Sequence, residues 1–312
     1  MITVSVPGKI HLMGEHAVVY GTPALFAVIN KRMIVSVEHA KKMEIITSES
    51  SDYVLYALEK VKEHVGLNIL PPMKITITSD IPAGFHLGSS AATAVGTVAA
   101  TIYFLKKLWN PNQINAIAYE VEKKQHGNPS GGDNTAVAMG GFVWFRKELE
   151  FLKSIWQLDI HIPPSLNHFF LINTGRPKET TGEMVTLVKL RFEKHPSIMK
   201  QQFLRNEEQV KRIAIALKEH DEKVLIDAIQ KGEQTLEKIS VVSKKVTPCI
   251  REVEASGGAA KILGGGGKKN GVGFILCYHT NSHKIETIGK RYGYEVQPIV
   301  LGGEGVRLER KD

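Results

Sequence analysis

"IPAGFHLGSSAATAVG", residues 81–96, places a turn of glycine and serine between an apolar run and an alanine-rich run. Glycine adopts backbone angles that other residues avoid, and it lets a ligand approach the main chain closely. The residues that follow, "SAATAVGTVAATIYFL" at 90–105, have the composition of a helix. Because a helix start offers unpaired N–H groups and the positive end of a dipole, this turn suits an anion. An ordinary loop with serine caps is the alternative.

Length and charge limit the classes of function. The chain has 312 residues and a formal net charge of +8. That length allows one large domain or two moderate ones. The positive charge suits an anionic substrate, and it would also suit nucleic acid. We expect no nucleic-acid partner, because the lysines and arginines are scattered and form no basic stripe interleaved with aromatic residues.

The sequence also bears on where the protein works. It contains no uninterrupted apolar run of about 18 residues, so we expect no membrane span. The first residues, "MITVSVPGKIHLMGEH", lack the basic stretch and the long apolar core of a secretory signal. Cys249 and Cys277 form neither a disulfide framework nor a metal-ligand spacing. We therefore expect a cytoplasmic protein, and the sequence leaves open whether it is a homodimer.

Strand-like and helix-like segments alternate along both halves of the chain. We predict strands over 2–6, 33–38, 74–78, 140–145, 168–175 and 271–278, with a break at Pro7-Gly8. We predict helices over 90–105, 110–127, most of 180–256, and 282–293. The irregular, proline-containing stretch near 150–167 is the predicted boundary between residues 1–155 and 156–312. The alternation predicts an α+β chain with two lobes.

Three glycine-bearing segments stand far apart in the sequence. They read "PGKIHLMGEHAVVYG", "IPAGFHLGSSAA" and "GGAAKILGGGG", with "HGNPSGGDNTAVAMGG" between the second and the third. This combination resembles the superfamily of galacto-, homoserine, mevalonate and phosphomevalonate kinases, and most closely its mevalonate kinases. The discriminating parts are "GEHAVVYG" and "HGNPSGGDN", and "NTGRPKETTGEMV" at 173–185 is similar to that family too. The resemblance covers residues 4–276.

The resemblance implies a two-lobed small-molecule kinase fold. Its N-terminal α/β lobe binds ATP and contains an element like ribosomal protein S5, and its C-terminal lobe is a ferredoxin-like α/β sandwich. The implied reaction is ATP-dependent phosphorylation of the 5-hydroxyl of mevalonate in isoprenoid biosynthesis, with Mg²⁺ as cofactor. One alternative is a sister kinase for phosphomevalonate or another small alcohol. The other is an inactive relative that binds a metabolite, although a mere binder needs no catalytic base.

The resemblance implies that Asp133 is the catalytic aspartate and that Lys9 is its cationic companion. Phosphoryl transfer needs charge neutralisation, alignment of the groups, and help with the proton of the attacking alcohol. A nearby ammonium would hold the aspartate ionised and stabilise charge on the transferring group. Taken alone, Lys9 could be a solvated surface lysine and Asp133 a residue of a turn.

Ser90 and Glu122 match the residues that coordinate Mg²⁺ in the family. One carboxylate and one hydroxyl are enough, because Mg²⁺ also binds substrate phosphates. By itself, Glu122 could be an exposed helix charge beside Lys123 and Lys124. The turn before the helix is expected to wrap the triphosphate of ATP. The implied nucleotide-binding residues are Ser79, Gly84, Phe85, His86, Leu87, Gly88, Ser89 and Ser90.

Glu15 and His16 match residues on the mevalonate side, where a carboxylate and a hydroxyl must be recognised. Ser130 and Thr181 are further candidates for substrate binding. Their alternative role is helix capping, since hydroxyls at loop and helix starts are commonly caps.

Two segments depart from the family pattern. Phe85-His86 stand where Ala-Gly is common, and Ile262-Leu263 precede the four glycines of the third segment. If the His86 ring faces the triphosphate, ATP should bind more tightly as the pH falls toward about 6. The alternative is a ring that is turned to solvent or packed with Phe85. Lys268-Lys269 could contact phosphate or form a solvated turn.

Overall fold

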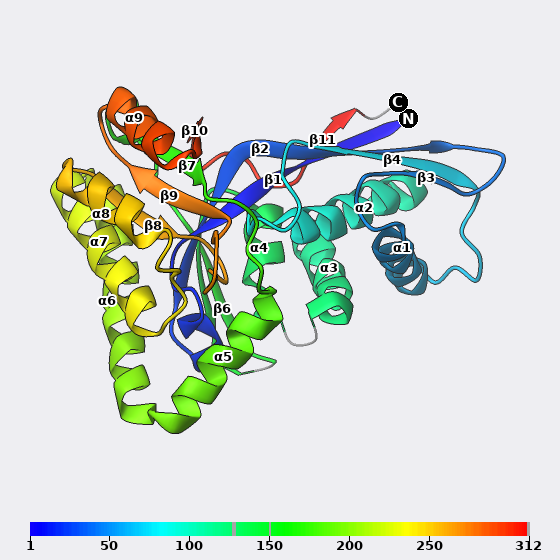
Figure 1. The fold of residues 1–312 in the computed structure, drawn as a ribbon. Coiled ribbons are helices and arrows are strands. Elements are labelled where there is room, and N and C mark those ends of the chain that lie inside the picture. The colour runs from blue at the N-terminus through cyan, green and yellow to red at the C-terminus, as the bar shows by residue number, and fades with distance from the viewer. Residues whose placement is uncertain (127–128, 150, 311–312) are drawn as a thin grey trace.

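Figure 1 shows the computed structural model, in which helices pack around two β-sheets. The structure describes residues 1–126, 129–149 and 151–310. Its elements are β1 (Ile2–Met13), a 3-10 turn (Ala17–Tyr20), β2 (Ala24–His39), β3 (Glu44–Ile46), α1 (Ser51–Val65), β4 (Met73–Ser79), α2 (Ser89–Lys106), α3 (Pro111–His126), α4 (Gly132–Met139), β5 (Phe142–Lys147), β6 (Lys153–Leu158), a second 3-10 turn (Pro164–Leu166), β7 (Phe169–Asn173), α5 (Thr181–Lys194), α6 (Pro196–Glu219), α7 (Glu222–Lys238), α8 (Thr247–Ala255), β8 (Ala259–Ile262), β9 (Phe274–Tyr278), α9 (Ser282–Tyr292), β10 (Glu295–Ile299) and β11 (Arg307–Arg310). Among the described residues, no helix is both long enough and apolar enough to cross a bilayer.

The first sheet is built around the long strand β2. Its strands run in the order β11, β1, β2, β4, β3. Two further strands extend the sheet, because β5 pairs with β2 and β6 pairs with β5. β1 and β4 pair with β2 in antiparallel fashion, whereas β3 and β4 are parallel. Helices α1, α2 and α3 lie together on one side of this sheet (Figure 1). The strand β4 alternates buried and less buried residues, as a strand with one face on a core should.

Helix α2 is the central helix of this lobe. Every residue from Ala91 to Ile102 is buried, because the helix contacts β1 and β2 as well as α1 and α3. Small residues allow this close packing: a Cβ on Gly96 would lie 2.7 Å from Cγ2 of Val35. Burial on all sides explains why this stretch of the helix carries no charged side chain.

The second sheet is antiparallel, with its strands in the order β10, β7, β9, β8. Its two faces belong to different cores, as neighbouring residues of β7 show. Leu171 packs into the main core, which also contains the first sheet and parts of α6 and α7, whereas Ile172 packs into a second core with α5, α8 and α9. The predicted α+β architecture with two lobes is confirmed.

Several segments differ from the predictions. β1 continues through Pro7-Gly8, so the predicted break is wrong, and the motif appears instead as a shift in the register of β1 against β2. Residues 51–65 and 132–139 form α1 and α4, where no helix is predicted. Five strands also lie outside the predicted elements: β3, β6, β8, β10 and β11.

The division of the chain at residue 155 stays a prediction. β6 runs through that position as the partner of β5. At the other end of the chain, β11 returns to the first sheet and pairs with β1. Any division into lobes therefore has to assign this C-terminal strand to the N-terminal sheet.

Candidate active site

A cavity of about 810 Å³ brings the glycine-bearing segments together. A volume of this size suits small-molecule ligands. Nine predicted site residues line it: Lys9, Glu15, His16, Gly84, His86, Glu122, Ser130, Asp133 and Thr181. Among the described residues, the lining does not include the other six predicted positions: Ser79, Phe85, Leu87, Gly88, Ser89 and Ser90. Gly127 and Asn128 of the segment at 126–134 lie outside the described residues.

Lys9 and Asp133 form an ion pair at the cavity wall. The Lys9 Nζ atom lies 2.8 Å from Oδ2 of Asp133. The lysine side chain is 2% exposed and the aspartate side chain is 39% exposed. Lys9 is therefore no solvated surface lysine, and Asp133 lies in the first turn of α4 rather than in an isolated turn. The pair presents an accessible carboxylate beside a buried ammonium.

The turn before α2 holds Lys9 in place. The Lys9 backbone N–H donates to the Leu87 carbonyl at 2.9 Å. Gly88 has a φ of 81°, and a Cβ there would lie 2.8 Å from Cγ of Lys9. Glycine at position 88 thus serves two needs, because it adopts left-handed backbone angles and leaves room for the lysine stem.

Glu122, on α3, lines the cavity and contacts the first turn of α2. Its Oε1 accepts a hydrogen bond from the Ser90 hydroxyl at 2.5 Å and another from the Tyr53 hydroxyl. The glutamate is 4% exposed, so it is no solvated helix charge. Burial, and then the neighbouring Glu122, raise the pKa of Tyr53, which keeps the phenol a hydrogen-bond donor. The adjacent Ser89 hydroxyl donates to Oε1 of Glu49 at 2.9 Å.

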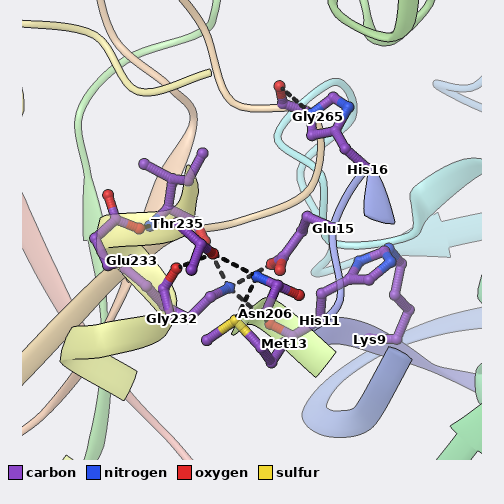
Figure 2. A network of polar contacts seen from close by, with 12 residues as sticks. Lys9, His11, Met13, Glu15, His16, Asn206, Gly232, Glu233, Thr235 and Gly265 are labelled. Carbon is purple, nitrogen blue, oxygen red and sulfur yellow. Dashed lines mark hydrogen bonds and ion pairs between the residues drawn. The ribbon is translucent and has the colours of Figure 1, made fainter. Parts of the chain in front are cut away.

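Glu15 and His16 follow β1, and Figure 2 shows the His16 ring beside the Gly265 carbonyl while the Glu15 carboxylate points the other way. The Glu15 carboxylate pairs with the ammonium of Lys261 on β8, and both side chains are almost completely buried. His16 Nε2 lies 3.1 Å from the Gly265 carbonyl oxygen. Burial lowers the pKa of His16 to about 4, so this ring is neutral near pH 7.

His86 adopts left-handed angles, with a φ of 64°, at a position where the family commonly has glycine. Such angles cost about 1 kcal/mol for a residue with a Cβ. Its ring packs against the third glycine segment, since a Cβ on Gly264 would lie 2.7 Å from the ring Cγ. Phe85 contacts Phe274 instead, with ring centroids 5.4 Å apart. The alternative of a ring turned to solvent or packed with Phe85 is therefore wrong, because the half-buried ring of His86 lies between loops at the cavity.

The burial of His86 also bears on its expected titration. Burial, and then the ammonium of Lys9, lower the pKa of His86 to about 4. The ring is therefore neutral between about pH 6 and 8. The structure gives no basis for tighter ATP binding through a charged His86 as the pH falls toward about 6.

The remaining predicted residues have local contacts of their own. Ser130 Oγ accepts a hydrogen bond from the Gly132 N–H at 3.1 Å, the contact expected of a hydroxyl at a helix start. Thr181 is the first residue of α5, after a cap made by Thr180. Ser79 ends β4, and its Oγ accepts from the Ile81 N–H at 3.0 Å. Their ligand-binding roles stay predictions. Lys268 and Lys269 are exposed in a bend, as a solvated turn requires.

Sequence reasoning missed His11 and Lys261. His11 follows Lys9 by two positions on β1, so both share one face of the strand, and its Nδ1 lies 3.4 Å from Lys9 Nζ. Burial, and then Lys9, lower the pKa of His11. Lys261 lies in a strand of four buried residues, and its charge in that apolar setting was the available signal. Tyr53 gave no signal, because α1 is not predicted.

The comparisons with known proteins agree with this geometry. Residues 52–141 match the family described as GHMP kinases N terminal domain. Together with the fold and the Lys9–Asp133 pair, this match defines the class as a small-molecule kinase. Mevalonate kinase from Archaeoglobus fulgidus is 34% identical over 271 residues, which cover 84% of this chain and 88% of that relative. The chain therefore belongs to the mevalonate kinase family.

Solved structures of two kinds share the fold. A structure of L. major mevalonate kinase in complex with R-mevalonate has a TM-score of 0.79 at 20% identity, covering 96% of each chain. A Streptococcus pneumoniae phosphomevalonate kinase in complex with phosphomevalonate and AMPPNP has a TM-score of 0.77 at 21% identity. It covers 96% of this chain and 100% of that one. At such identities the likeness shows the fold alone, so the family assignment rests on the sequence relatives.

Proposed function

We propose that the protein transfers the γ-phosphoryl group of ATP to the 5-hydroxyl of mevalonate, giving 5-phosphomevalonate and ADP for isoprenoid biosynthesis. The observation that carries this proposal is the ion pair of Lys9 with Asp133 at the wall of the cavity. Membership in the mevalonate kinase family supports mevalonate as the acceptor.

Asp133 and Lys9 would share the work of the transfer step. The carboxylate of Asp133 orients the attacking hydroxyl and takes its proton. As the new O–P bond forms, the bond between the γ-phosphorus and the bridging oxygen of ADP breaks. The buried ammonium of Lys9 stabilises negative charge on the transferring group. Its fixed position costs no reorganisation during the reaction.

The phosphates of ATP would lie between the turn at 84–90 and the loop before α5. The turn leads into the start of α2, whose unpaired N–H groups favour an anion. Arg176 and Lys178 line the same cavity. A Cβ on Gly84 would lie 3.0 Å from Nε of Arg176, so this guanidinium stands against the turn. In this proposal, both cations bind the phosphates of ATP.

Ser90 and Glu122 would hold Mg²⁺. Mg²⁺ prefers hard oxygen ligands and usually combines one or two protein oxygens with substrate phosphates. The Ser90 hydroxyl and the Glu122 carboxylate converge beside the cavity, which fits that pattern. Within the described residues, no three His, Cys, Asp or Glu side chains form a metal-binding group. When bound, Mg²⁺ supplies positive charge to the phosphate oxygens.

We expect Ser90→Ala and Glu122→Gln each to weaken apparent Mg²⁺ affinity by about 10-fold or more, because the first removes an oxygen ligand and the second removes the negative charge of the carboxylate. A Mg²⁺ titration of the kinase rate at saturating ATP measures this. Thr93→Ala is the matched control, since the Thr93 hydroxyl lies one turn further along α2 and donates to the Ser89 carbonyl. Parent-like titrations for both ligand variants would place the metal elsewhere.

An assay of ADP release with four acceptors tests the proposed function. The purified protein is supplied with mevalonate, phosphomevalonate, galactose or homoserine in the presence of ATP and Mg²⁺. We expect turnover with mevalonate, and at least about 100-fold lower kcat/KM for the other three acceptors. Faster ADP release with phosphomevalonate would instead assign the chain to the sister activity.

A further inference from the structure

Lys261 carries a buried charge that the proposed transfer step does not use. Its side chain is fully buried on β8. The ammonium has three N–H donors, and three oxygens accept from it. These are Oε1 of Glu15, the His11 carbonyl at 3.1 Å and the Ile262 carbonyl at 2.7 Å. Because all three donors are used inside the protein, Lys261 has none left for a ligand.

Glu15 is the only side chain among these partners, and its two oxygens differ. Oε1 is paired with Lys261, whereas Oε2 is buried without a hydrogen-bond partner among the described residues. Leaving a buried acceptor unpaired is costly. Glu15 lines the cavity, so a hydroxyl of a bound molecule could donate to Oε2.

The segments that carry Glu15 and Lys261 are joined at a second point. His16 follows Glu15 directly, and its Nε2 lies 3.1 Å from the Gly265 carbonyl, in the loop that β8 enters. Two contacts therefore fix the turn after β1 against the strand and loop at 261–265. Because Glu15 is paired with Lys261 and the next residue, His16, contacts Gly265, the Glu15 carboxylate has little freedom to rotate.

We propose that Lys261 is a positioning residue that holds Glu15 as an ionised, fixed carboxylate, so that Oε2 accepts a hydrogen bond from a hydroxyl of the acceptor alcohol. This inference rests on the proposed function, because it takes the acceptor to be bound in this cavity. Lys261 itself does not touch the acceptor. It acts through Glu15, and it connects the third glycine segment to acceptor binding.

The charges around Glu15 show what the loss of Lys261 would do. Burial raises the pKa of Glu15, and the ammonium of Lys261 opposes that rise more strongly than Lys9 does. Glu233 is a second buried carboxyl near Lys261, and burial raises its pKa well above the usual range. Its Oε2 accepts from the Ile262 N–H at 3.0 Å. The neighbouring rings of His11 and His16 are kept neutral by burial.

We expect Lys261→Met to raise the KM for mevalonate by about 10-fold or more near neutral pH, because a hydrogen bond to a charged acceptor is stronger than one to a neutral group. The KM for ATP should change by less than about twofold, since the ATP contacts are elsewhere. Because Glu15 then ionises only at higher pH, the KM for mevalonate should fall as the pH rises. The KM of the variant should fall over a higher pH range than any fall in the KM of the parent protein. Steady-state kinetics from about pH 6 to 9 measure this.

Two further variants distinguish a positioning role of Lys261 from a purely structural role. Lys231→Met removes a lysine that pairs with Asp227 on the surface, and it should leave both KM values unchanged. Lys261→Arg keeps the cation and should recover part of the affinity for mevalonate. If Lys261→Met lowers the melting temperature but leaves the KM for mevalonate and its pH profile as in the parent, the role is structural and the proposal is wrong.

A double variant keeps the test decisive if Lys261→Met does not fold. Glu15→Gln combined with Lys261→Met removes both buried charges, so no unpaired charge remains. Its KM for mevalonate should match that of Glu15→Gln alone within about twofold, because Lys261 acts only through Glu15. A further several-fold increase would overturn the proposal. A parent without mevalonate kinase activity would instead refute the proposed function, which separates the two failures.

Discussion

Asp133→Asn is expected to lower kcat by at least about 100-fold while the dissociation constant of ATP changes by less than about threefold. The amide keeps the shape of the side chain, but it carries no charge and takes no proton from the attacking hydroxyl. Asp133 is 39% exposed at the cavity wall, so the change meets little steric resistance. Single-turnover phosphorylation of mevalonate measures the transfer step, and calorimetric titration measures ATP binding.

Asp227→Asn is the matched control for this experiment. Asp227 is 41% exposed and forms ion pairs with Arg212 and Lys231 on the surface of the C-terminal lobe. Surface pairs contribute little to stability, so this variant should keep the parent rate. Near-normal turnover in Asp133→Asn would contradict the role of that carboxylate. If Asp133→Asn lost both ATP binding and turnover, the ion pair with Lys9 would serve nucleotide binding.

The sequence identified much of the candidate site because motifs record local chemistry. Lys9 and Asp133 lie in segments that carry the resemblance to the kinase family, the resemblance implies the role of Glu122, and all three residues line the cavity. What it could not show is how segments far apart pair with one another. Lys261 is 246 positions from Glu15, and no local pattern links a lysine on β8 to a turn after β1. Such buried pairs are fixed by tertiary packing alone.

The fold was predictable where a segment has its own periodicity. The helix at 90–105 and the strands at 33–38 and 74–78 lie within α2, β2 and β4. β11 is a short edge strand whose pairing with β1 depends on the chain returning across the molecule. His86 shows the same limit at a single residue, because its left-handed backbone is imposed by the turn and by the loop against which its ring packs.

Lys9→Met is expected to lower kcat by about 100-fold or more, since it removes the fixed cation from the transferring group. The methionine side chain fills most of the space of the lysine stem, which lies against Gly88. Asp133 is partly exposed, so it stays solvated when its partner is lost and the fold should survive. The rate of mevalonate phosphorylation at saturating ATP and Mg²⁺ measures the effect.

His11 offers a second readout for this variant, independent of activity. Its Nδ1 lies 3.4 Å from Lys9 Nζ, and Lys9 is the second cause, after burial, that lowers the pKa of His11. Removing the ammonium should therefore raise the pKa of His11, which an NMR titration of the ring protons detects. Lys9→Arg keeps the charge but spreads it over a planar group, so it should hold the pKa of His11 low while recovering little of the rate. If Lys9→Met raised the pKa of His11 yet left kcat at the parent value, the cation beside Asp133 would have no part in catalysis.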